Sequence, residues 1–189
     1  MPPKAKFTSE EIVTAALSII REKGIDALTA RELGARLGSS ARPVFTVFKS
    51  MQEVLEEAIK EARAIYRSYV ERGLLEVPSF KGVGTEYIRF AREEPKLFQL
   101  LFMTERENAP GLSSVLPKIE DSYEEILSSV QDSYQIDEKN AVKLYQHLWI
   151  YTHGIATLCA TRVCSFSAEE ISGMLTEVCA SILKEMKTK

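Results

Sequence analysis

Apolar positions along the 189 residues recur at steps of three and four, the period of an amphipathic helix, and no segment shows the clear alternation of a strand. The first apolar run lies between Thr8 and Gly24. Thr8 and Glu11 have the spacing of a capping box, and the glycine predicts the end of the helix. The pattern therefore predicts an N-terminal helix over this stretch.

Two shorter helices are predicted on either side of a Gly-Ser-Ser break at residues 38–40. Thr29, followed three residues later by a glutamate, predicts a capping box at the start of the first helix, and Gly38 predicts its end. Ser40 is placed to cap a second helix over Ala41–Val47, in which Pro43 falls in the first turn and loses no backbone hydrogen bond. Two short helices joined by a tight turn are typical of a helix-turn-helix.

The predicted second helix has two chemically different sides. Val44, Val47 and Phe48 are expected to point inward. The residues expected to face a DNA groove are Ala41, Arg42, Phe45 and Thr46. Arg42 is the one long cationic side chain in this helix, and arginine reads guanine bidentately in the major groove. The sequence therefore predicts a DNA-recognition surface.

The motif resembles the DNA-binding domain of the TetR family of transcriptional regulators, through a pattern met by Thr29, Leu33, Gly34, Leu37, Gly38, Ser40, Val44, Phe45 and Phe48. Where many members carry Tyr and His, this chain has Phe45 and Val47, and Met51 replaces a frequent Lys. The resemblance implies double-stranded operator DNA as a partner, contacted by Thr29, Arg31, Ser40, Ala41, Arg42, Phe45, Thr46 and Lys49. Helix capping is an equally suitable role for Thr29 and Ser40.

Charge is distributed unevenly between the two parts of the chain. Residues 1–50 carry eight Lys or Arg against five acidic residues, a balance of +3, and because the whole chain has a net charge of −3 the remainder sums to −6. Phosphate binding needs a local cationic face rather than a basic protein. An excess of this size also occurs on ordinary solvated faces, so it supports DNA binding without indicating it alone.

Helical patterns continue to the end of the chain. A long linking helix is predicted over residues 50–73, followed by helices over Phe80–Arg92, Lys96–Met103, Pro117–Gln135, Ala141–Cys164 and Ser167–Met186. We therefore expect an all-α fold. An N-terminal three-helix helix-turn-helix domain (residues 1–50) is followed by a C-terminal helical bundle for effector binding and dimerisation (residues 51–189).

The last two predicted helices are the most hydrophobic part of the chain. Apolar residues fall on every side of Ala141–Cys164, so this helix needs burial on more than one face. A homodimer that packs these two helices against their copies satisfies that need. The residues expected at the dimer interface are Ala156, Ala160, Ile171, Leu175, Val178 and Ile182.

The C-terminal part resembles the WHG type of TetR C-terminal domain, through Tyr87–Met103 and through Leu148–Leu158, which contains Trp149, His153 and Gly154. The resemblance implies a cavity for a small-molecule effector. Its candidate lining residues are Phe90, Phe98, Phe102, Met103, Tyr123, Trp149, Tyr151 and His153. Aromatic residues at helical spacing also serve as ordinary core.

Other chemistries find little support in the sequence. His147 and His153 are six residues apart, a spacing that does not place two metal ligands on one helical face, and no nucleophile or nucleotide-binding motif is present. We expect no cofactor, metal or catalytic residue. Cys159, Cys164 and Cys179 are expected to be reduced, buried thiols. No apolar run approaches the roughly 18 residues that span a bilayer, so we expect a cytoplasmic protein without a membrane partner.

These patterns predict a homodimeric, sequence-specific transcriptional regulator, a repressor released by a small ligand. The alternative is an all-helical ligand carrier or enzyme whose N-terminal tri-helix is merely structural. Only the regulator requires a salt-sensitive complex with specific DNA.

Overall fold

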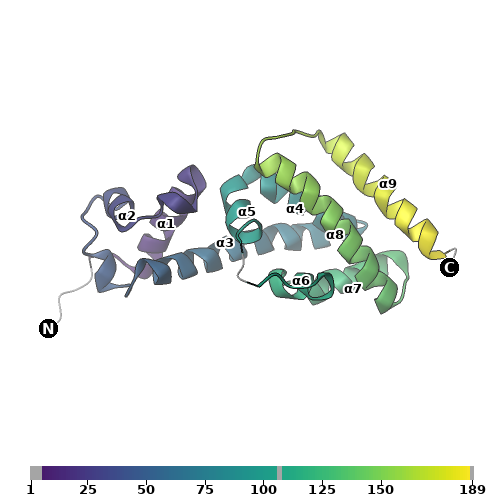
Figure 1. Cartoon of the computed structure of the whole chain (residues 1–189), viewed down its shortest axis with the longest axis horizontal. Helices are drawn as coiled ribbons and strands as arrows, with labels where there is room; N and C mark the ends of the chain where they lie inside the picture. The colour runs from purple at the N-terminus through teal and green to yellow at the C-terminus, as the bar shows by residue number, and fades with distance from the viewer. Residues whose placement is uncertain (1–5, 106–107, 188–189) are drawn as a thin grey trace. The chain divides into compact units, whose positions relative to one another are not determined.

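A computed structural model of the chain describes residues 6–105 and 108–187 (Figure 1). Every regular element within these ranges is a helix, which confirms the predicted all-α class. The chain forms two compact units: the first comprises the residues up to Ile65 together with Lys96–Thr104, and the second comprises Tyr66–Pro95 and the residues from Glu105 onward. α3 (Met51–Leu74) contributes to both units.

The first unit begins with α1 (Ser9–Lys23), whose N-terminus has the predicted capping box. The Glu11 amide donates to Thr8 Oγ1 at 3.1 Å, and the Thr8 amide donates to Glu11 Oε2 at 2.8 Å. A one-turn 3₁₀ helix, η1 (Ile25–Ala27), leads into α2 (Ala30–Arg36). α5 (Pro95–Phe102) supplies the remaining helix of this unit, with buried Leu97 and Phe98.

The start of α2 shows only half of the predicted capping box. Thr29 Oγ1 accepts from the Glu32 amide at 3.2 Å, as predicted. The Glu32 carboxylate binds Lys23 Nζ at 2.7 Å, and the Thr29 amide donates to the carbonyl oxygen of Ala27. The lysine of α1 therefore holds the side chain that was expected to complete the cap.

The turn after α2 depends on two glycines. Gly38 has φ +62°, the left-handed conformation in which a Cβ is strained. At Gly34 a Cβ would lie 2.7 Å from the backbone of both Ser40 and Ala41, so only glycine lets the chain after the turn pass so close to α2. Gly34 is therefore a site of close backbone packing within the motif.

The predicted second motif helix over Ala41–Val47 is wrong in its length and cap. The structure has a single 3₁₀ turn, η2 (Val44–Thr46), which begins at Pro43 and has no side-chain cap from Ser40. Pro43 supplies no backbone N–H, and both the amide and the hydroxyl of Thr46 donate to the Pro43 carbonyl oxygen, at 3.2 and 2.7 Å. Hydrogen bonds between residues three apart are those of a 3₁₀ turn. They replace the bonds between residues four apart that an α-helix would need here.

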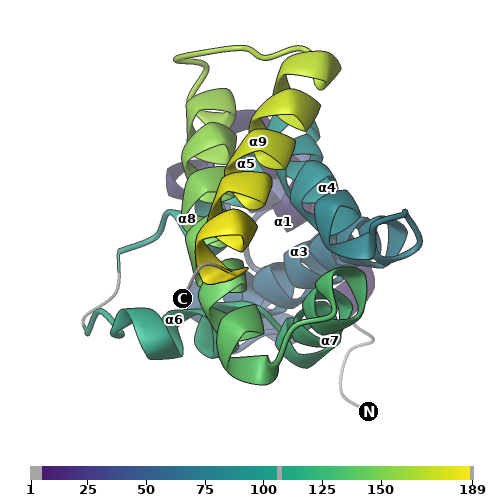
Figure 2. The same cartoon turned by 90° about the vertical axis from the view of Figure 1, so that its right-hand side faces the viewer.

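The second unit is a helical bundle around α8 (Glu138–Ala160). α8 packs against α4 (Ser79–Glu93), α7 (Tyr123–Tyr134) and α9 (Ala168–Lys187), and α9 also contacts α4 (Figure 2). A shorter helix, α6 (Leu112–Ile119), also packs against α8.

Two predicted helix boundaries in this unit are wrong. The helix expected over Pro117–Gln135 is broken between α6 and α7, because Glu120 adopts an extended backbone and its carboxylate is used inside the unit. The helix expected to reach Cys164 ends at Ala160, where a turn leads to Arg162 with φ +58°. The last helix begins close to the predicted Ser167, where the Glu170 amide donates to Ser167 Oγ at 3.2 Å.

Gly34→Ala should destabilise the first unit. The new methyl group would overlap backbone atoms of Ser40 and Ala41, which cannot rotate away as a side chain can. We expect a loss of about 1–3 kcal/mol in chemical denaturation, typical of an overpacked core. Gly111→Ala is the matched control, because a Cβ there has no neighbour within 4 Å among the described atoms. Equal stability of the two variants would contradict the close approach.

Candidate nucleic-acid interface and ligand cavity

The helix-turn-helix presents one side of η2 to solvent and buries the other. Val44 is fully buried and Phe48 nearly so, which confirms them as inward anchors, while Val47 is half-buried. On the outer side Phe45 is 47% exposed, and Arg42 and Thr46 are exposed as well. Ala41 is half-buried. Despite its shorter helix, the motif therefore displays three of the four side chains predicted to face a groove.

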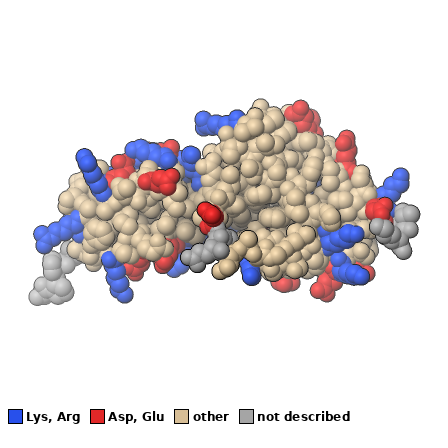
Figure 3. Space-filling model, viewed as in Figure 1, with Lys and Arg blue, Asp and Glu red and all other residues tan. Residues whose placement is uncertain are grey.

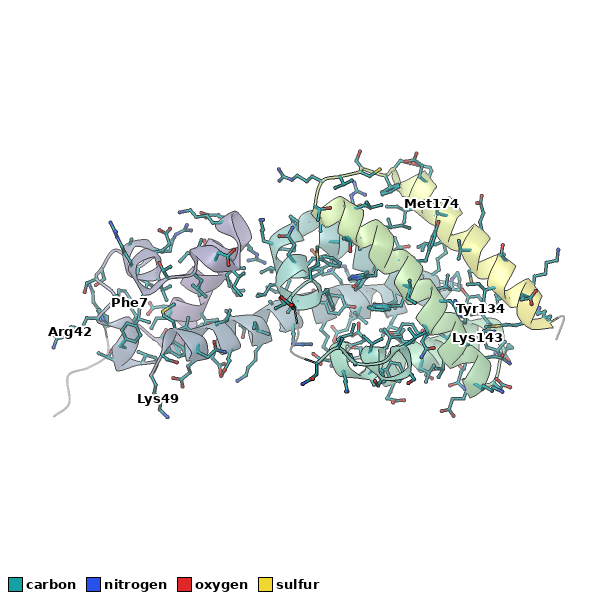
Figure 4. The ribbon with its side chains drawn as sticks, in the orientation of Figure 1. Phe7, Arg42, Lys49, Tyr134, Lys143 and Met174 are labelled. Atoms are coloured by element: carbon teal, nitrogen blue, oxygen red, sulfur yellow. The ribbon has the colours of Figure 1, made fainter. Side chains whose placement is uncertain are left out.

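Two cations flank this surface without being engaged by the described residues. Arg42 and Lys49 are exposed, and no hydrogen bond or ion pair among residues 6–105 and 108–187 involves either side chain. Both point away from the body of the first unit (Figure 4). The Lys49 amide is used, since it donates to Glu53 Oε2 at 2.6 Å, and this bond fixes the start of α3.

Thr29, Arg31 and Ser40 lie at the edges of the motif. All three are exposed. Thr29 serves as the α2 cap described above, whereas Ser40 caps no helix and is exposed. A capping role for Ser40 is thus excluded, and its predicted DNA contact stays a prediction.

Other cations of the motif are neutralised by neighbouring carboxylates. Arg36 binds both carboxylate oxygens of Glu22, at 2.7 and 2.6 Å, and its guanidinium holds the Glu22 pKa below the usual value. The ammonium of Lys23 lowers the pKa of Glu32 in the same way. The cations left for an external anion among the described residues include Arg42 and Lys49 near η2 and Arg31 on α2. Figure 3 shows Lys and Arg side chains standing out from the first unit between acidic ones.

The second unit contains a partly open cavity of about 310 Å³. This volume lies at the lower end of the range of about 300–1,000 Å³ that is usual for small-ligand pockets. Side chains from five helices line it, and most of them are aromatic or aliphatic. The principal lining residues are Tyr66, Phe80, Val83, Tyr87, Ile126, Tyr134, Tyr145, Leu148, Trp149, Leu175 and Leu183.

Charged groups reach the cavity from two places. Glu120, 7% exposed, lies at the break between α6 and α7; its carboxylate accepts from the Tyr66 hydroxyl at 2.5 Å and from the Ser122 amide at 3.1 Å. Lys81 lies on α4 and donates to Ser172 Oγ at 2.8 Å and to Thr176 Oγ1 at 2.9 Å. Each charged group is therefore held by named hydrogen-bond partners of the same unit.

The Glu120 charge is felt by the rings around it. Burial raises the pKa values of Tyr66, Tyr87 and Tyr145, and the nearby negative charge of Glu120 raises them further. All three tyrosines therefore stay protonated across the accessible pH range, and Tyr66 keeps the proton that it donates to Glu120.

Of the eight residues predicted to bind a ligand, Trp149 lines the cavity and the others lie elsewhere. Phe90 is fully buried against Tyr66 and Tyr69, with ring centroids 5.3 and 5.2 Å apart. Phe98 and Phe102 contact each other in α5, within the first unit. Met103 is 40% exposed and Tyr151 is half-buried.

Two further residues predicted to bind a ligand, Tyr123 and His153, contact side chains that line the cavity. Tyr123 stacks on Tyr145, with ring centroids 5.6 Å apart. His153 Nδ1 lies 2.9 Å from the Tyr87 hydroxyl, and its ring stacks on Trp149. Burial lowers the His153 pKa, which favours the neutral imidazole at neutral pH.

Sequence reasoning missed Glu120 and Lys81. Glu120 was placed inside a continuous helix, where a glutamate normally faces solvent, and only the break in the chain turns it inward. Tyr66 and Tyr69 are three residues apart, which indicates a shared helical face, but this spacing does not distinguish a cavity from a packed core.

Four of the six predicted dimer residues are buried within the chain itself. They are Ala156, Ala160, Ile171 and Leu175. Val178 and Ile182 are half-buried. The exposed apolar side chains nearby come instead from α8, where Ile150 is 50% and Leu158 is 38% exposed. The face of the second unit seen in Figure 3 is mostly free of charged side chains over α8.

The described residues hold no cluster of three or more His, Cys, Asp or Glu suited to a metal ion. The three cysteines are free, but only Cys179 is buried; Cys159 is half-buried and Cys164 is exposed, so the expectation of three buried thiols is wrong. Cys164 lies beyond the early end of α8, in the loop before α9. None of the helices within residues 6–105 and 108–187 has both the length and the apolar character to cross a bilayer.

Comparison with known protein families assigns both parts of the chain. The pattern of the tetracyclin repressor-like C-terminal domain matches residues 80–180, more than half of the chain, and the pattern of bacterial regulatory proteins of the tetR family matches residues 12–58. The chain belongs to the TetR family. The resemblance inferred from the helix-turn-helix residues is thereby confirmed.

Curated relatives of this TetR-family protein include the class D tetracycline repressor of Escherichia coli and the class H tetracycline repressor of Photobacterium damsela subsp. piscicida. Each is 26% identical over 105 residues, which is 56% of this chain and 44% of the relative. The match therefore spans less than half the length of either relative.

Solved structures share the fold of this TetR-family protein at low sequence identity. The fatty acid degradation regulator FadR from Bacillus halodurans aligns with a TM-score of 0.58 and 14% identity, over 95% of this chain and 97% of that chain. A TetR-family transcriptional regulator from Mesorhizobium loti MAFF303099 aligns with a TM-score of 0.54 and 17% identity, over 93% and 95%. These likenesses concern the arrangement of helices only.

Tyr66→Phe should destabilise this TetR-family protein. The change removes the phenolic hydroxyl that donates to the buried Glu120 carboxylate, and an underpaired buried carboxylate costs about 1.5–3 kcal/mol. Chemical denaturation at neutral pH measures the loss. Tyr69→Phe, three residues away, removes a similar bond to the half-exposed Glu93 and should cost less. A greater loss for Tyr69→Phe would show that Glu120 is not the sensitive partner.

Proposed function

We propose that this TetR-family chain is a sequence-specific DNA-binding transcriptional regulator, a repressor whose hold on operator DNA is released by a small ligand in the second unit. The observation that carries the proposal is the exposed surface of η2, with Arg42, Phe45 and Thr46 beside Lys49, on a motif that matches the family's DNA-binding pattern. The tetracycline repressors are named for the same activity.

The chemistry of this surface suits a major groove. The Arg42 guanidinium can pair with a guanine edge, and the exposed Phe45 ring is an apolar partner for a thymine methyl group. Lys49 lies three residues after the end of η2 and supplies a cation for a phosphate oxygen. Side chains that can contact bases and a side chain that can contact the DNA phosphate backbone therefore lie together on this surface.

A ligand carrier or enzyme with a merely structural tri-helix is the competing function. In such a carrier or enzyme the exposed Arg and Lys side chains would not bind DNA together, so the protein would form no sequence-specific DNA complex. A mobility-shift titration against a random DNA library, repeated at two salt concentrations, separates the two functions. Enrichment of one sequence, with affinity that falls as salt rises, supports the regulator. Absence of any salt-sensitive complex supports the carrier.

We further propose that the active form is a homodimer, joined through the exposed apolar face of α8 with contributions from Val178 and Ile182 of α9. Apolar side chains gathered on one face gain stability when a second copy covers them. Two recognition motifs in a twofold dimer read half-sites roughly 34–36 Å apart, or multiples of that spacing.

Ligand release requires only unequal binding. An effector that prefers the DNA-incompetent form of the dimer by about 1–3 kcal/mol changes operator affinity roughly 5- to 150-fold. The cavity of about 310 Å³ in the second unit is the site offered for it, since its lining is mainly apolar with a few fixed polar groups.

Arg42→Ala should weaken operator binding by about 1–3 kcal/mol and relax the preference at one base position, because the bidentate contact to a guanine is lost. Selection from a random DNA library measures both effects. Arg42→Lys is the matched control: it keeps the positive charge but lacks the planar fork, so it should retain more affinity and still lose selectivity. Unchanged base preference in Arg42→Ala would remove Arg42 from the reading surface.

Lys49→Ala should weaken binding to every DNA sequence alike and flatten the dependence of log affinity on log salt by about one unit, the effect of one lost phosphate contact. Fluorescence anisotropy at several salt concentrations measures the slope. Lys118→Ala removes another exposed lysine, from α6 of the second unit, and should leave the slope unchanged. A loss confined to one operator sequence would assign Lys49 to base reading.

Ile150→Glu should convert the dimer to monomers that lose specific DNA binding, since the change buries two unpaired charges beside the proposed twofold axis. Sedimentation velocity and mobility shift measure the two outcomes. Ile150 is half-exposed in the single chain, so the variant should still fold. Leu75→Glu places the same charge at an 85% exposed leucine of the α3–α4 loop and should remain dimeric. A stable dimer of Ile150→Glu would place the interface elsewhere.

A further inference from the structure

The polar lining of the cavity points to the class of ligand it takes. Glu120 is more than nine-tenths buried and its side chain borders the cavity, which makes it the most deeply placed charge there. Two donors, the Tyr66 hydroxyl and the Ser122 amide, hold the carboxylate in one orientation. A negative charge fixed at a largely apolar wall attracts a cation more strongly than the same charge in bulk water does.

Aromatic rings around the carboxylate reinforce this preference. Tyr66, Tyr87, Tyr145 and Trp149 all line the cavity. Tyr66 and Tyr87 meet edge to face, with ring centroids 5.9 Å apart, so their ring faces point in different directions. The faces of tyrosine and tryptophan rings carry partial negative charge and attract ammonium groups within about 6 Å.

Lys81 also lines the cavity, and it raises the opposite possibility of an acidic ligand such as a fatty acid. Its ammonium, however, is held by the hydroxyls of Ser172 and Thr176 on α9, and the residue is half-buried, so water screens its charge more than that of Glu120. A carboxylate drawn into the cavity would also meet the charge of Glu120. The buried group therefore sets the sign of the preferred ligand.

We propose that the cavity takes a lipophilic organic monocation, an amine or quaternary ammonium group on an apolar body, with the cationic end beside Glu120 and the rings of Tyr66, Tyr87 and Tyr145. The apolar body lies along the aliphatic wall that includes Val83, Leu148 and Leu175. This assignment rests on the proposed role of the second unit as the effector-binding part of a regulator.

Isothermal titration of the full-length protein tests the ligand class directly. Three probes with the same alkyl chain are used below their micelle concentrations: decyltrimethylammonium, decanol and decanoate. We expect decyltrimethylammonium to bind most tightly and decanoate most weakly. Glu120→Gln should weaken decyltrimethylammonium roughly 10- to 100-fold, the value of a contact to a buried charge, and leave decanol unchanged. Glu124→Gln, at an exposed carboxylate of α7, is the matched control and should bind all three probes as the parent does.

A second variant keeps the test decisive if Glu120→Gln fails to fold. Trp149→Leu keeps an apolar side chain at a half-buried position but removes the π face, so it should weaken decyltrimethylammonium relative to decanol. Decanoate binding more tightly than the cation would overturn the proposal. So would equal affinities for the cation and the alcohol, or undiminished cation binding in Glu120→Gln.

A parallel DNA titration separates this proposal from the proposed function. Operator binding without any cation affinity would overturn the ligand class and leave the regulator standing. Cation binding that depends on Glu120 but leaves operator affinity unchanged would support the ligand class and remove the cation as effector. A chain that binds the cation and no DNA would support the ligand class and overturn the regulator.

Discussion

The arrangement of the second unit depends on one buried carboxylate. Glu120 ends α6 and accepts hydrogen bonds from the Tyr66 hydroxyl on α3 and from the Ser122 amide just before α7. A charged group in a largely apolar interior is tolerated only when donors surround it, so these bonds fix where the chain turns between two helices. The same turn brings Glu120 to the cavity wall. The break in the helix and the character of the cavity therefore have one cause.

In the first unit, ion pairs decide which cations remain for DNA. Arg36 and Lys23 carry the same positive charge as Arg42 and Lys49, but Glu22 and Glu32 pair with them across the α1–α2 contact. Exposed ion pairs of this kind add little stability. Their larger effect is to remove positive charge from the side of the motif away from η2. Arg42 and Lys49, on either side of the turn that displays Phe45 and Thr46, have no such partner among the described residues.

α3 gives the two units a shared element. Its start is fixed by Ser50 and by the Lys49 amide bond to Glu53, next to the proposed phosphate contact, and its later turns carry Tyr66 at the cavity. The helix is continuous from Met51 to Leu74. Tyr66 and the capping bonds at Ser50 therefore belong to one continuous helix.

Local signals in the sequence determined the helices, most of their caps and the position of the motif. The Thr8–Glu11 box, the left-handed Gly38 and the Ser50 and Ser167 caps depend on residues within a few positions of one another, and each is present. Tertiary contacts decided the rest. The Glu32 carboxylate pairs with Lys23 instead of completing the α2 cap, and the helix predicted over Pro117–Gln135 is broken at the buried Glu120. Of the predicted pocket residues, Trp149 alone reached the cavity, because helical periodicity identifies a buried face, whereas a cavity depends on how faces from separate helices fail to fill the space between them.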